Sequence, residues 1–193
     1  MSLLLVIRHG PTDWNEAGLI QGRTDRPLSE AGREQVRATR LPAGWADAQC
    51  LASPLSRAME TAALLRLDPT PEPRLIEMAW GEWEGKSLVA LRGELGAAME
   101  ENEAKGLDFR PPGGESPRDV QARLRPLLRG LGGRTIFVTH KGVLRALYAL
   151  ATGWTMTSKA PQKLLDRRTH AFAVGVDGAP SVVELNIALG SLS

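Results

Sequence analysis

Short apolar runs alternate along the chain with longer amphipathic segments. Runs of strand length occupy residues 3–7, 50–52 and 135–139. Continuous apolar runs of this kind are typical of buried parallel strands. Apolar residues at helical spacing predict helices from about residue 30 to 40 and from about 142 to Gly153, and others after possible N-cap serines. Those N-cap candidates are Ser29, Ser53, Ser87 and Ser116.

The remaining segments predict loops and a late hairpin. Residues 10–28 form a long irregular loop, residues 68–73 form an extended connector with alternate prolines, and residues 74–77 form a short strand. Pro126 should kink or divide the helix that begins after Ser116. Strands at about 171–176 and 181–186 are joined through Asp177-Gly178, a hairpin signal.

This order of elements predicts an α/β fold. Strands that alternate with helices favour a three-layer α/β/α sandwich, with a mainly parallel central sheet, helices on both faces and a late antiparallel hairpin. A chain of 193 residues is long enough for one sizeable core, so we expect a single domain over residues 1–193.

The amino-acid composition limits the cellular compartment and the classes of binding partner that we expect. The net charge is only +2, which gives no electrostatic case for binding nucleic acid or a membrane surface. No apolar run approaches the ~20 residues that span a bilayer, and the apolar start is too short for a signal peptide. Cys50 is the only cysteine, so no intrachain disulfide can form and a cytoplasmic protein is expected.

Basic and imidazole side chains follow three of the predicted strands. Arg8 and His9 come directly after the first strand, Arg57 lies in the first helical turn after the second, and His140 ends the strand at 135–139. The carboxyl ends of parallel strands meet at one edge of a sheet, where ligands bind in open α/β folds. We therefore expect these four side chains to converge.

Two histidines and two arginines suit phosphate better than a metal ion. Arginines beside the histidines would repel a dication, and no H-x-H or H-E-x-x-H spacing occurs. A guanidinium group can donate two parallel hydrogen bonds to two oxygens of one phosphate. A neutral imidazole is a competent nucleophile toward phosphorus. We predict phosphoryl transfer to an imidazole with no metal site and no other cofactor.

Five blocks in order resemble the histidine phosphatase superfamily, also called the phosphoglycerate mutase-like proteins. The resemblance covers nearly the whole chain. The blocks are Arg8-His9-Gly10 with Asn15, Gln21-Gly22, Pro27-Leu28-Ser29 and Gly32; residues 53–58 with Thr61-Ala62; residues 75–77 running into 81–85; residues 112–116; and Val138-Thr139-His140.

The resemblance implies a role for each matched residue. His9 would form a phosphohistidine, and Glu77 would protonate the leaving oxygen and then take a proton from water. Glu82 and Glu84 are rival proton donors close in sequence. The phosphoryl group would be clamped by Arg8, Arg57 and His140, with help from Asn15, Gln21 and Gly22.

Lys141 departs from the family pattern, in which glycine is common after the second histidine. One interpretation is that Lys141 reaches the phosphate or a second acidic group of the substrate. The other is that its stem points into solvent.

The resemblance favours a metal-independent phosphatase that acts on a small phosphate ester. Its features are closest to the broad-specificity and α-ribazole phosphatase branches. A cofactor-dependent phosphoglycerate mutase is the first alternative, although such mutases carry a tandem arginine pair that is absent between Glu77 and His140. A non-catalytic phosphate-binding regulatory module is the second alternative. Loops at residues 80–105 and 154–168 are expected to set substrate specificity.

Overall fold

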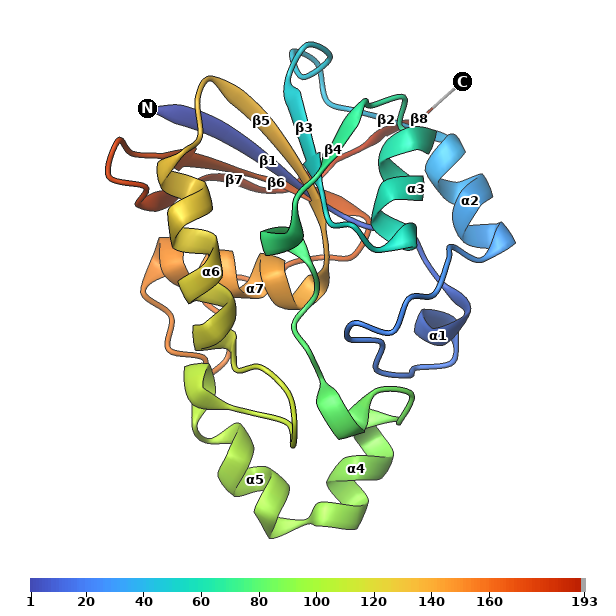
Figure 1. The fold of residues 1–193 in the computed structure, drawn as a ribbon, viewed down its shortest axis with the longest axis vertical. Coiled ribbons are helices and arrows are strands. Elements are labelled where there is room, and N and C mark those ends of the chain that lie inside the picture. Colours follow the sequence, from blue (N-terminus) through green and yellow to red (C-terminus); the bar gives the residue numbers. More distant parts are fainter. Residues whose placement is uncertain (192–193) are drawn as a thin grey trace.

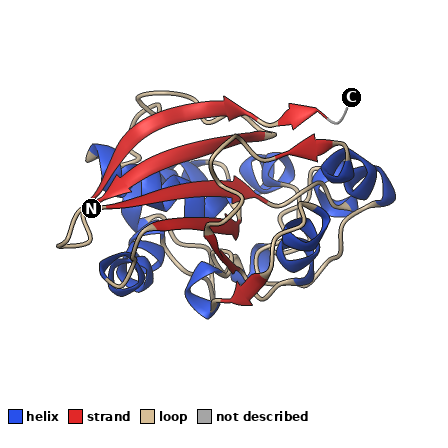
Figure 2. Ribbon diagram, turned by 90° about the horizontal axis from the view of Figure 1, so that it is seen from above, coloured by secondary structure: helices blue, strands red, loops and turns tan. Residues whose placement is uncertain are grey.

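Six strands form the central sheet, in which four pair in parallel and the last two are joined through antiparallel pairs. The computed structural model describes residues 1–191 of the chain. The strand order is β4-β3-β5-β1-β6-β7, and Figure 2 shows these strands side by side in one twisted sheet. Their bounds are β1 (Ser2–Arg8), β3 (Gln49–Ala52), β4 (Pro69–Pro71), β5 (Arg134–Thr139), β6 (Arg168–Val174) and β7 (Pro180–Ala188). Two short strands, β2 (Thr39–Arg40) and β8 (Gly190–Ser191), pair separately.

Seven α-helices and three short 3₁₀ turns connect the described strands. The α-helices are α1 (Asp13–Glu16), α2 (Glu30–Arg37), α3 (Ser56–Leu64), α4 (Leu88–Leu95), α5 (Ala97–Glu103), α6 (Pro117–Arg129) and α7 (Lys141–Thr152). The 3₁₀ turns are η1 (Pro73–Leu75), η2 (Gly81–Trp83) and η3 (Gly106–Asp108). Within residues 1–191, no helix has both the length and the apolar character needed to cross a bilayer.

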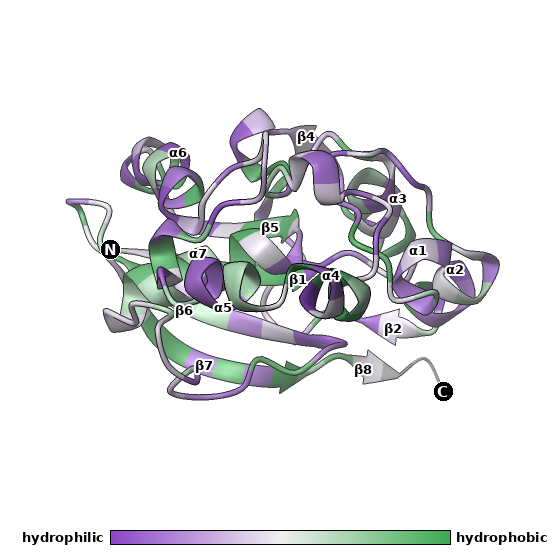
Figure 3. Cartoon of the chain, turned by 90° about the horizontal axis from the view of Figure 1, so that it is seen from below, coloured by the Kyte–Doolittle hydropathy of each residue, from purple (hydrophilic) through white to green (hydrophobic). Residues whose placement is uncertain are grey.

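Alternation along β1 divides the core into two layers. Leu4 and Val6 pack with residues of α6 and α7, whereas Leu5 and Ile7 pack with residues of α2 and α3 on the opposite face. Figure 1 shows these two helix pairs on either side of the sheet, and Figure 3 shows apolar residues along β5 against more polar surfaces on α2 and α6. The predicted three-layer α/β/α sandwich with a late antiparallel hairpin is confirmed.

A third apolar cluster lies away from the sheet. α4 and α5 project to the end of the molecule opposite the N-terminus and β8 (Figure 1). Trp83, Leu91 and Met99 are buried there, with Trp80 and Phe109 packed against them. This small cluster holds the 80–109 segment as one unit.

Several expected boundaries are confirmed by cap contacts. The Ser29 hydroxyl accepts from the Gly32 amide, and Ser116 forms a capping box with Asp119. Gly153 ends α7 in the left-handed conformation.

The helix expected from Ser53 begins later, so that prediction was wrong. α3 starts at Ser56, and its N-cap residue Leu55 makes no side-chain cap bond. The Ser53 hydroxyl instead lies 2.7 Å from His140 Nε2. A tertiary contact therefore takes the hydroxyl that a local cap would have used.

The proline-rich region and two helices also differ from expectation. Residues 69–71 pair with β3 as an edge strand, where proline is tolerated, and η1 replaces the strand expected at 74–77. Gly96, with φ of 49°, separates α4 from α5. α6 runs through Pro126 undivided, since Leu124, Leu127 and Leu128 anchor both sides of the exposed proline in the core.

Candidate active site

The strand ladder brings the two candidate histidines together. β1 and β5 are adjacent and parallel, with Arg8 opposite Thr139, so the residues that follow them emerge side by side. The rings of His9 and His140 have centroids 5.0 Å apart and planes tilted by 56°. A cavity of about 1030 Å³, here called the His9 cavity, opens beside them. Among the residues expected from sequence, it is lined by Arg8, His9, Asn15, Gln21, Gly22, Arg57, Glu77 and Lys141.

His9 is held in the tautomer that a nucleophile requires. Its Nδ1 lies 2.7 Å from the Gly10 carbonyl oxygen, which can only accept, so the proton of a neutral ring sits on Nδ1. The Nε2 lone pair is then free. Burial, with Arg8 and Arg57 nearby, lowers the pKa of His9 well below 6.5. The ring is therefore neutral at pH 7.

Arg57 is fully buried and fixed by the loop that precedes α2. Its Nη2 donates to the Gly22 carbonyl at 2.7 Å, and its Nη1 donates to the Thr24 carbonyl at 3.0 Å. Gly22 adopts φ of 53°, and a Cβ there would lie 2.0 Å from Glu84 Oε1. Glycine at this position thus allows the loop to reach Arg57.

His140 lies behind His9 and is closed off from solvent. The Arg57 Nε donates to Nδ1 at 3.3 Å, which places the imidazole proton on Nε2, toward the Ser53 hydroxyl. Burial, then the positive groups around it, lower the pKa of His140 well below 6.5. The ring is fully buried and contributes no lining to the His9 cavity. In this arrangement it contacts Arg57 and Ser53 with its two nitrogens.

Arg8 extends along the wall of the cavity and forms an ion pair with Asp166. Its Nε is buried and has no hydrogen-bond partner among residues 1–191. A buried guanidinium N–H without an acceptor is costly, and an anionic oxygen in the cavity would supply that acceptor.

Glu77 is the buried carboxyl group of the site. It accepts from the Met78 amide at 2.8 Å and from the Gly142 amide at 3.2 Å. Burial raises its pKa, although those hydrogen bonds and the charges of Arg57 and Arg8 oppose the shift. A carboxyl group with a raised pKa can act as a proton donor near neutral pH.

The two rival carboxylates are placed differently. Glu82 is exposed and does not line the cavity. Glu84 accepts from the amides of Arg23, Thr24 and Trp80 at 2.8–3.1 Å and so ties the loops together. Partial burial favours its protonated form, but the bonds from Thr24 and the amides lower its pKa overall. Geometry therefore favours Glu77 as the proton donor.

Gly142 is a close neighbour of Glu77 that sequence reasoning did not single out. A Cβ at this position would lie 2.5 Å from Glu77 Oε1 and 3.2 Å from Met78 Cβ. The absence of a side chain therefore lets the carboxyl group reach the first turn of α7. A glycine two residues after His140, in the first turn of a predicted helix, is a signal that could have revealed this contact.

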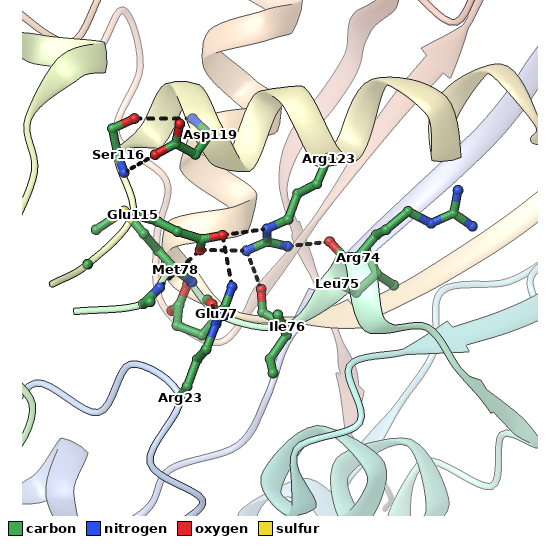
Figure 4. A network of polar contacts seen from close by, with 12 residues as sticks. Arg23, Arg74, Leu75, Ile76, Glu77, Met78, Glu115, Ser116, Asp119 and Arg123 are labelled. Atoms are coloured by element: carbon green, nitrogen blue, oxygen red, sulfur yellow. Dashed lines mark hydrogen bonds and ion pairs between the residues drawn. The ribbon is translucent and has the colours of Figure 1, made fainter. Parts of the chain in front are cut away.

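A polar network behind Glu77 holds its backbone (Figure 4). Arg123 of α6 donates to the Arg74 carbonyl and, at 2.6 Å, to the Ile76 carbonyl. Glu115 pairs with Arg123 and accepts from the Ala79 amide at 3.1 Å. Sequence analysis missed Arg123, which carries no motif signal and meets this segment only through the fold.

Glu115 also connects the network to the loop before α2. Arg23 donates to Glu115 at 2.8 Å and, from its Nε, to the Glu77 carbonyl at 3.4 Å. The segment that carries Glu77 is therefore held from α6 on one side and from the 10–28 loop on the other.

Four of the expected residues remain to be placed. Asn15 caps α1 through its Oδ1, and its Nδ2 makes no hydrogen bond within the described chain. Gln21 donates to the Thr12 hydroxyl, while its Oε1 is buried without a partner in the same range. Gly22 acts through its carbonyl on Arg57. Lys141 is exposed at the start of α7, where burial of its stem and the charge of Arg8 lower its pKa.

Within residues 1–191, no group of three or more His, Cys, Asp or Glu side chains is arranged to hold a metal ion. The positive groups at the cavity are side chains of this chain, notably Arg8, Arg57 and Lys141.

Comparison with known proteins gives one consistent family. The model of the histidine phosphatase superfamily (branch 1) matches residues 4–176. A 2,3-bisphosphoglycerate-dependent phosphoglycerate mutase of Methylobacterium radiotolerans is 34% identical over 170 residues, covering 79% of this chain and 80% of the mutase.

Phosphatases are equally similar. The glucosyl-3-phosphoglycerate phosphatase of Mycobacterium tuberculosis is 34% identical over 165 residues, covering 76% of this chain and 73% of that protein. The solved structure of a mycobacterial glucosyl-3-phosphoglycerate phosphatase with VO3 superposes with a TM-score of 0.80 at 27% identity, covering 97% of this chain and 100% of that one.

Proposed function

Because this chain belongs to the histidine phosphatase superfamily, we propose that it is a phosphomonoester phosphatase that works through a phosphohistidine on a small phosphorylated metabolite. The observation that carries the proposal is the hydrogen bond of 2.7 Å between His9 Nδ1 and the Gly10 carbonyl. It leaves the Nε2 lone pair of a neutral imidazole in a cavity that Arg8 and Arg57 also line.

In the first step, His9 Nε2 attacks phosphorus in line with the ester oxygen. The N–P bond forms as the P–O bond to the alcohol breaks, and Arg8 and Arg57 offset the charge on the equatorial oxygens. Glu77, whose pKa is raised by burial, gives its proton to the departing oxygen. The alcohol leaves, and Glu77 is then ionised.

In the second step, water attacks the phosphohistidine. Glu77 takes a proton from the water as the new P–O bond forms and the N–P bond breaks. Inorganic phosphate leaves, and the His9 lone pair is restored. Two guanidinium groups supply the charge that a metal would supply elsewhere, so the proposed reaction uses neither a metal nor another cofactor.

Other residues are proposed to act around this core. His140 holds Arg57 in place through the hydrogen bond of 3.3 Å from Arg57 Nε to His140 Nδ1. His140 itself would contact the phosphoryl group only if this hydrogen bond broke. Asn15 and Gln21 offer amide groups to the equatorial oxygens, Gly22 orients Arg57, and Lys141 meets the substrate at the rim.

Cofactor-dependent phosphoglycerate mutase is the second candidate. The 2,3-bisphosphoglycerate-dependent phosphoglycerate mutase of Methylobacterium radiotolerans shares 34% identity with this chain. A mutase must return the phosphoryl group to a substrate before water reaches it. The phosphatase relative, at the same identity, and the absence of a tandem arginine pair between Glu77 and His140 favour hydrolysis. A non-catalytic phosphate-binding module would not need a neutral nucleophile beside a buried acid.

One experiment separates these functions. The chain is incubated with p-nitrophenyl phosphate with and without EDTA, and acid-labile phosphoprotein is trapped in wild type and His9→Ala. Turnover that resists EDTA, with a trapped phosphate that depends on His9, supports the phosphatase. Interconversion of 3- and 2-phosphoglycerate with added bisphosphoglycerate supports the mutase. Absence of both turnover and trapped phosphate would leave the binding module.

We also propose that residues 1–193 act as one domain in the cytoplasm. Cys50 is a buried free thiol, and burial, followed by the charge of Asp68, raises its pKa to about 12. Such a thiol is unreactive. The proposed partner is a small phosphate ester, with neither nucleic acid nor membrane involved.

A further inference from the structure

A second cavity lies beside the His9 cavity and shares a wall with it. This cavity, here called the His170 cavity, has a volume of about 440 Å³ and lies between the start of α7 and residues 154–168. Arg8, Lys141, Arg145 and Asp166 line both cavities. These shared residues, with the ion pair of Arg8 and Asp166 among them, form the boundary between the two cavities.

The lining of the His170 cavity is strongly basic. Its only carboxylate is Asp166, which is paired with Arg8, whereas the whole chain has a net charge of only +2. Within residues 1–191, no ion pair engages the other five cationic groups. The six cationic residues of the lining are Arg8, Lys141, Arg145, Lys159, Lys163 and Arg168. A hollow with this charge attracts an anion.

His170 adds a buried hydrogen-bond donor that lacks an acceptor. The ring is fully buried in β6 and lines the cavity. Its Nδ1 accepts from the Asn186 amide at 3.2 Å, so the proton of the neutral ring is on Nε2. Burial lowers the pKa of His170 to about 4, which keeps the ring neutral at pH 7.

The Nε2 of His170 has no partner in the described part of the chain. A buried N–H without an acceptor costs stability, so such groups are usually satisfied by a ligand or ordered water. The basic lining favours a negatively charged acceptor over a neutral one.

We propose that the His170 cavity binds a second acidic group of the substrate, a carboxylate. The natural substrate is then a phosphomonoester with two anionic ends. This inference rests on the proposed phosphatase function, because the first anion is the phosphoryl group at His9. Arg8 and Lys141, on the shared wall, contact the substrate between its two ends.

Matched aryl esters test the second subsite. Phenyl phosphate and the three carboxyphenyl phosphates share one reaction and differ by a carboxylate. We expect kcat/KM to favour a carboxylated ester by about tenfold, the size of one charge-assisted hydrogen bond. Acetate, as a free carboxylate, should compete against that ester and leave phenyl phosphate unaffected.

Variants of His170 separate its two nitrogens. His170→Asn keeps an acceptor near the Nδ1 position for the Asn186 amide and removes the donor at Nε2. The ratio of kcat/KM for the carboxylated ester to kcat/KM for phenyl phosphate should therefore fall toward one. His170→Gln places an N–H near the Nε2 position and should retain much of the preference. Lys159→Gln and Lys163→Gln, both exposed, test the same cavity without changing the core. Lys105→Gln is the matched control, because Lys105 is exposed and lines neither cavity.

The outcomes distinguish this inference from the proposed function. Failure of the wild type to hydrolyse phenyl phosphate would remove both. Hydrolysis of phenyl phosphate at the same kcat/KM as every carboxylated ester, in wild type and variants alike, would overturn the second subsite alone. If acetate instead changed the turnover of phenyl phosphate in a way that depends on His170, the cavity would bind a free anion and the assignment to the substrate would be wrong.

Discussion

His9 and His140 face each other with ring centroids 5.0 Å apart, close to two guanidinium groups. Protonation of either ring would add a buried positive charge to a region that already holds Arg8 and Arg57. His170 is buried as well, and its pKa is also lowered. All three histidines of the chain are therefore neutral in the folded state at pH 7 and protonate more easily when it unfolds.

This difference predicts that acid destabilises the fold below about pH 6.5, the ordinary histidine pKa. In that range the unfolded chain binds more protons, and each histidine lowers the free energy of unfolding by about 1.4 kcal/mol per pH unit. The contribution of His170 ends near pH 4, where the folded ring protonates. Glu77, with a raised pKa, acts in the opposite direction. Urea unfolding between pH 5 and 7 measures the net slope.

The slope of the free energy of unfolding against pH gives the number of protons taken up when the chain unfolds. That number should fall by about one in His170→Asn. Asp13→Asn is the control. The hydrogen bond with Arg26 lowers the pKa of Asp13, so this carboxyl group does not titrate between pH 5 and 7. A slope that stays the same in His170→Asn would contradict a lowered pKa for the buried His170.

Glu77→Gln should slow esters with alkyl leaving groups by about 10²- to 10⁴-fold, because an alkoxide needs a proton to leave. The effect on phosphoenzyme formation from p-nitrophenyl phosphate should be much smaller, since nitrophenolate leaves without a proton. The phosphohistidine should then accumulate, because the base for the second step is missing. Rapid-quench trapping measures both steps.

Glu82→Gln is the matched control for this prediction, because Glu82 is exposed outside the cavity. Loss of alkyl ester turnover in Glu82→Gln, with Glu77→Gln unaffected, would reverse the assignment of the proton donor.

Arg123→Lys should lower kcat by about ten- to a hundredfold with little change in KM, because the carbonyls before Glu77 lose their shared donor. The free energy of unfolding should fall by roughly 1–3 kcal/mol. Looser packing lets water reach Glu77 and lowers its pKa, so the alkaline limb of the kcat/KM profile should move to lower pH.

Arg118→Lys, on the exposed side of α6, is the control for Arg123. A fall in stability with no movement of the alkaline limb would mean that Arg123 only supports the fold and does not position Glu77.

Gly142→Ala should displace Glu77, because the added Cβ would lie 2.5 Å from its Oε1. We expect a loss of alkyl ester turnover in the same direction as in Glu77→Gln but smaller, with formation of the phosphohistidine retained. Gly93→Ala is the control: apart from its chain neighbours and the backbone of its own helix, nothing lies within 4 Å of the added Cβ, and the change should stabilise α4 by about 1 kcal/mol. Unchanged kinetics in Gly142→Ala would show that the carboxyl group tolerates the shift.

The sheet and the meeting of the histidines were predictable because they depend on local signals and one rule of topology. Apolar runs mark the strands, and parallel pairing brings the ends of β1 and β5 together. The N-cap predictions at Ser29 and Ser116 succeeded for the same reason, since each cap contacts an amide three residues away.

Contacts between distant segments were not predictable in this way. Ser53 was expected to cap a helix, but its hydroxyl meets His140, 87 positions later in the chain. Arg123 reaches Ile76 across 47 positions, and no local pattern distinguishes it from the other arginines of α6. The raised pKa of Glu77 depends on burial, which only the folded core provides.

The register between β1 and β5 has a consequence for protein engineering. The positions of His9 and His140 follow from main-chain pairing of Arg8 with Thr139. Part of the lining of the His9 cavity comes instead from Leu88 and Arg92 on α4 and from Glu103 on α5. The residues that position the two histidines and the residues of α4 and α5 that line the cavity thus belong to different parts of the fold. Under the proposed function, exchange of the 88–103 segment between homologues should alter selectivity for the alcohol part of the ester and leave His9 in place.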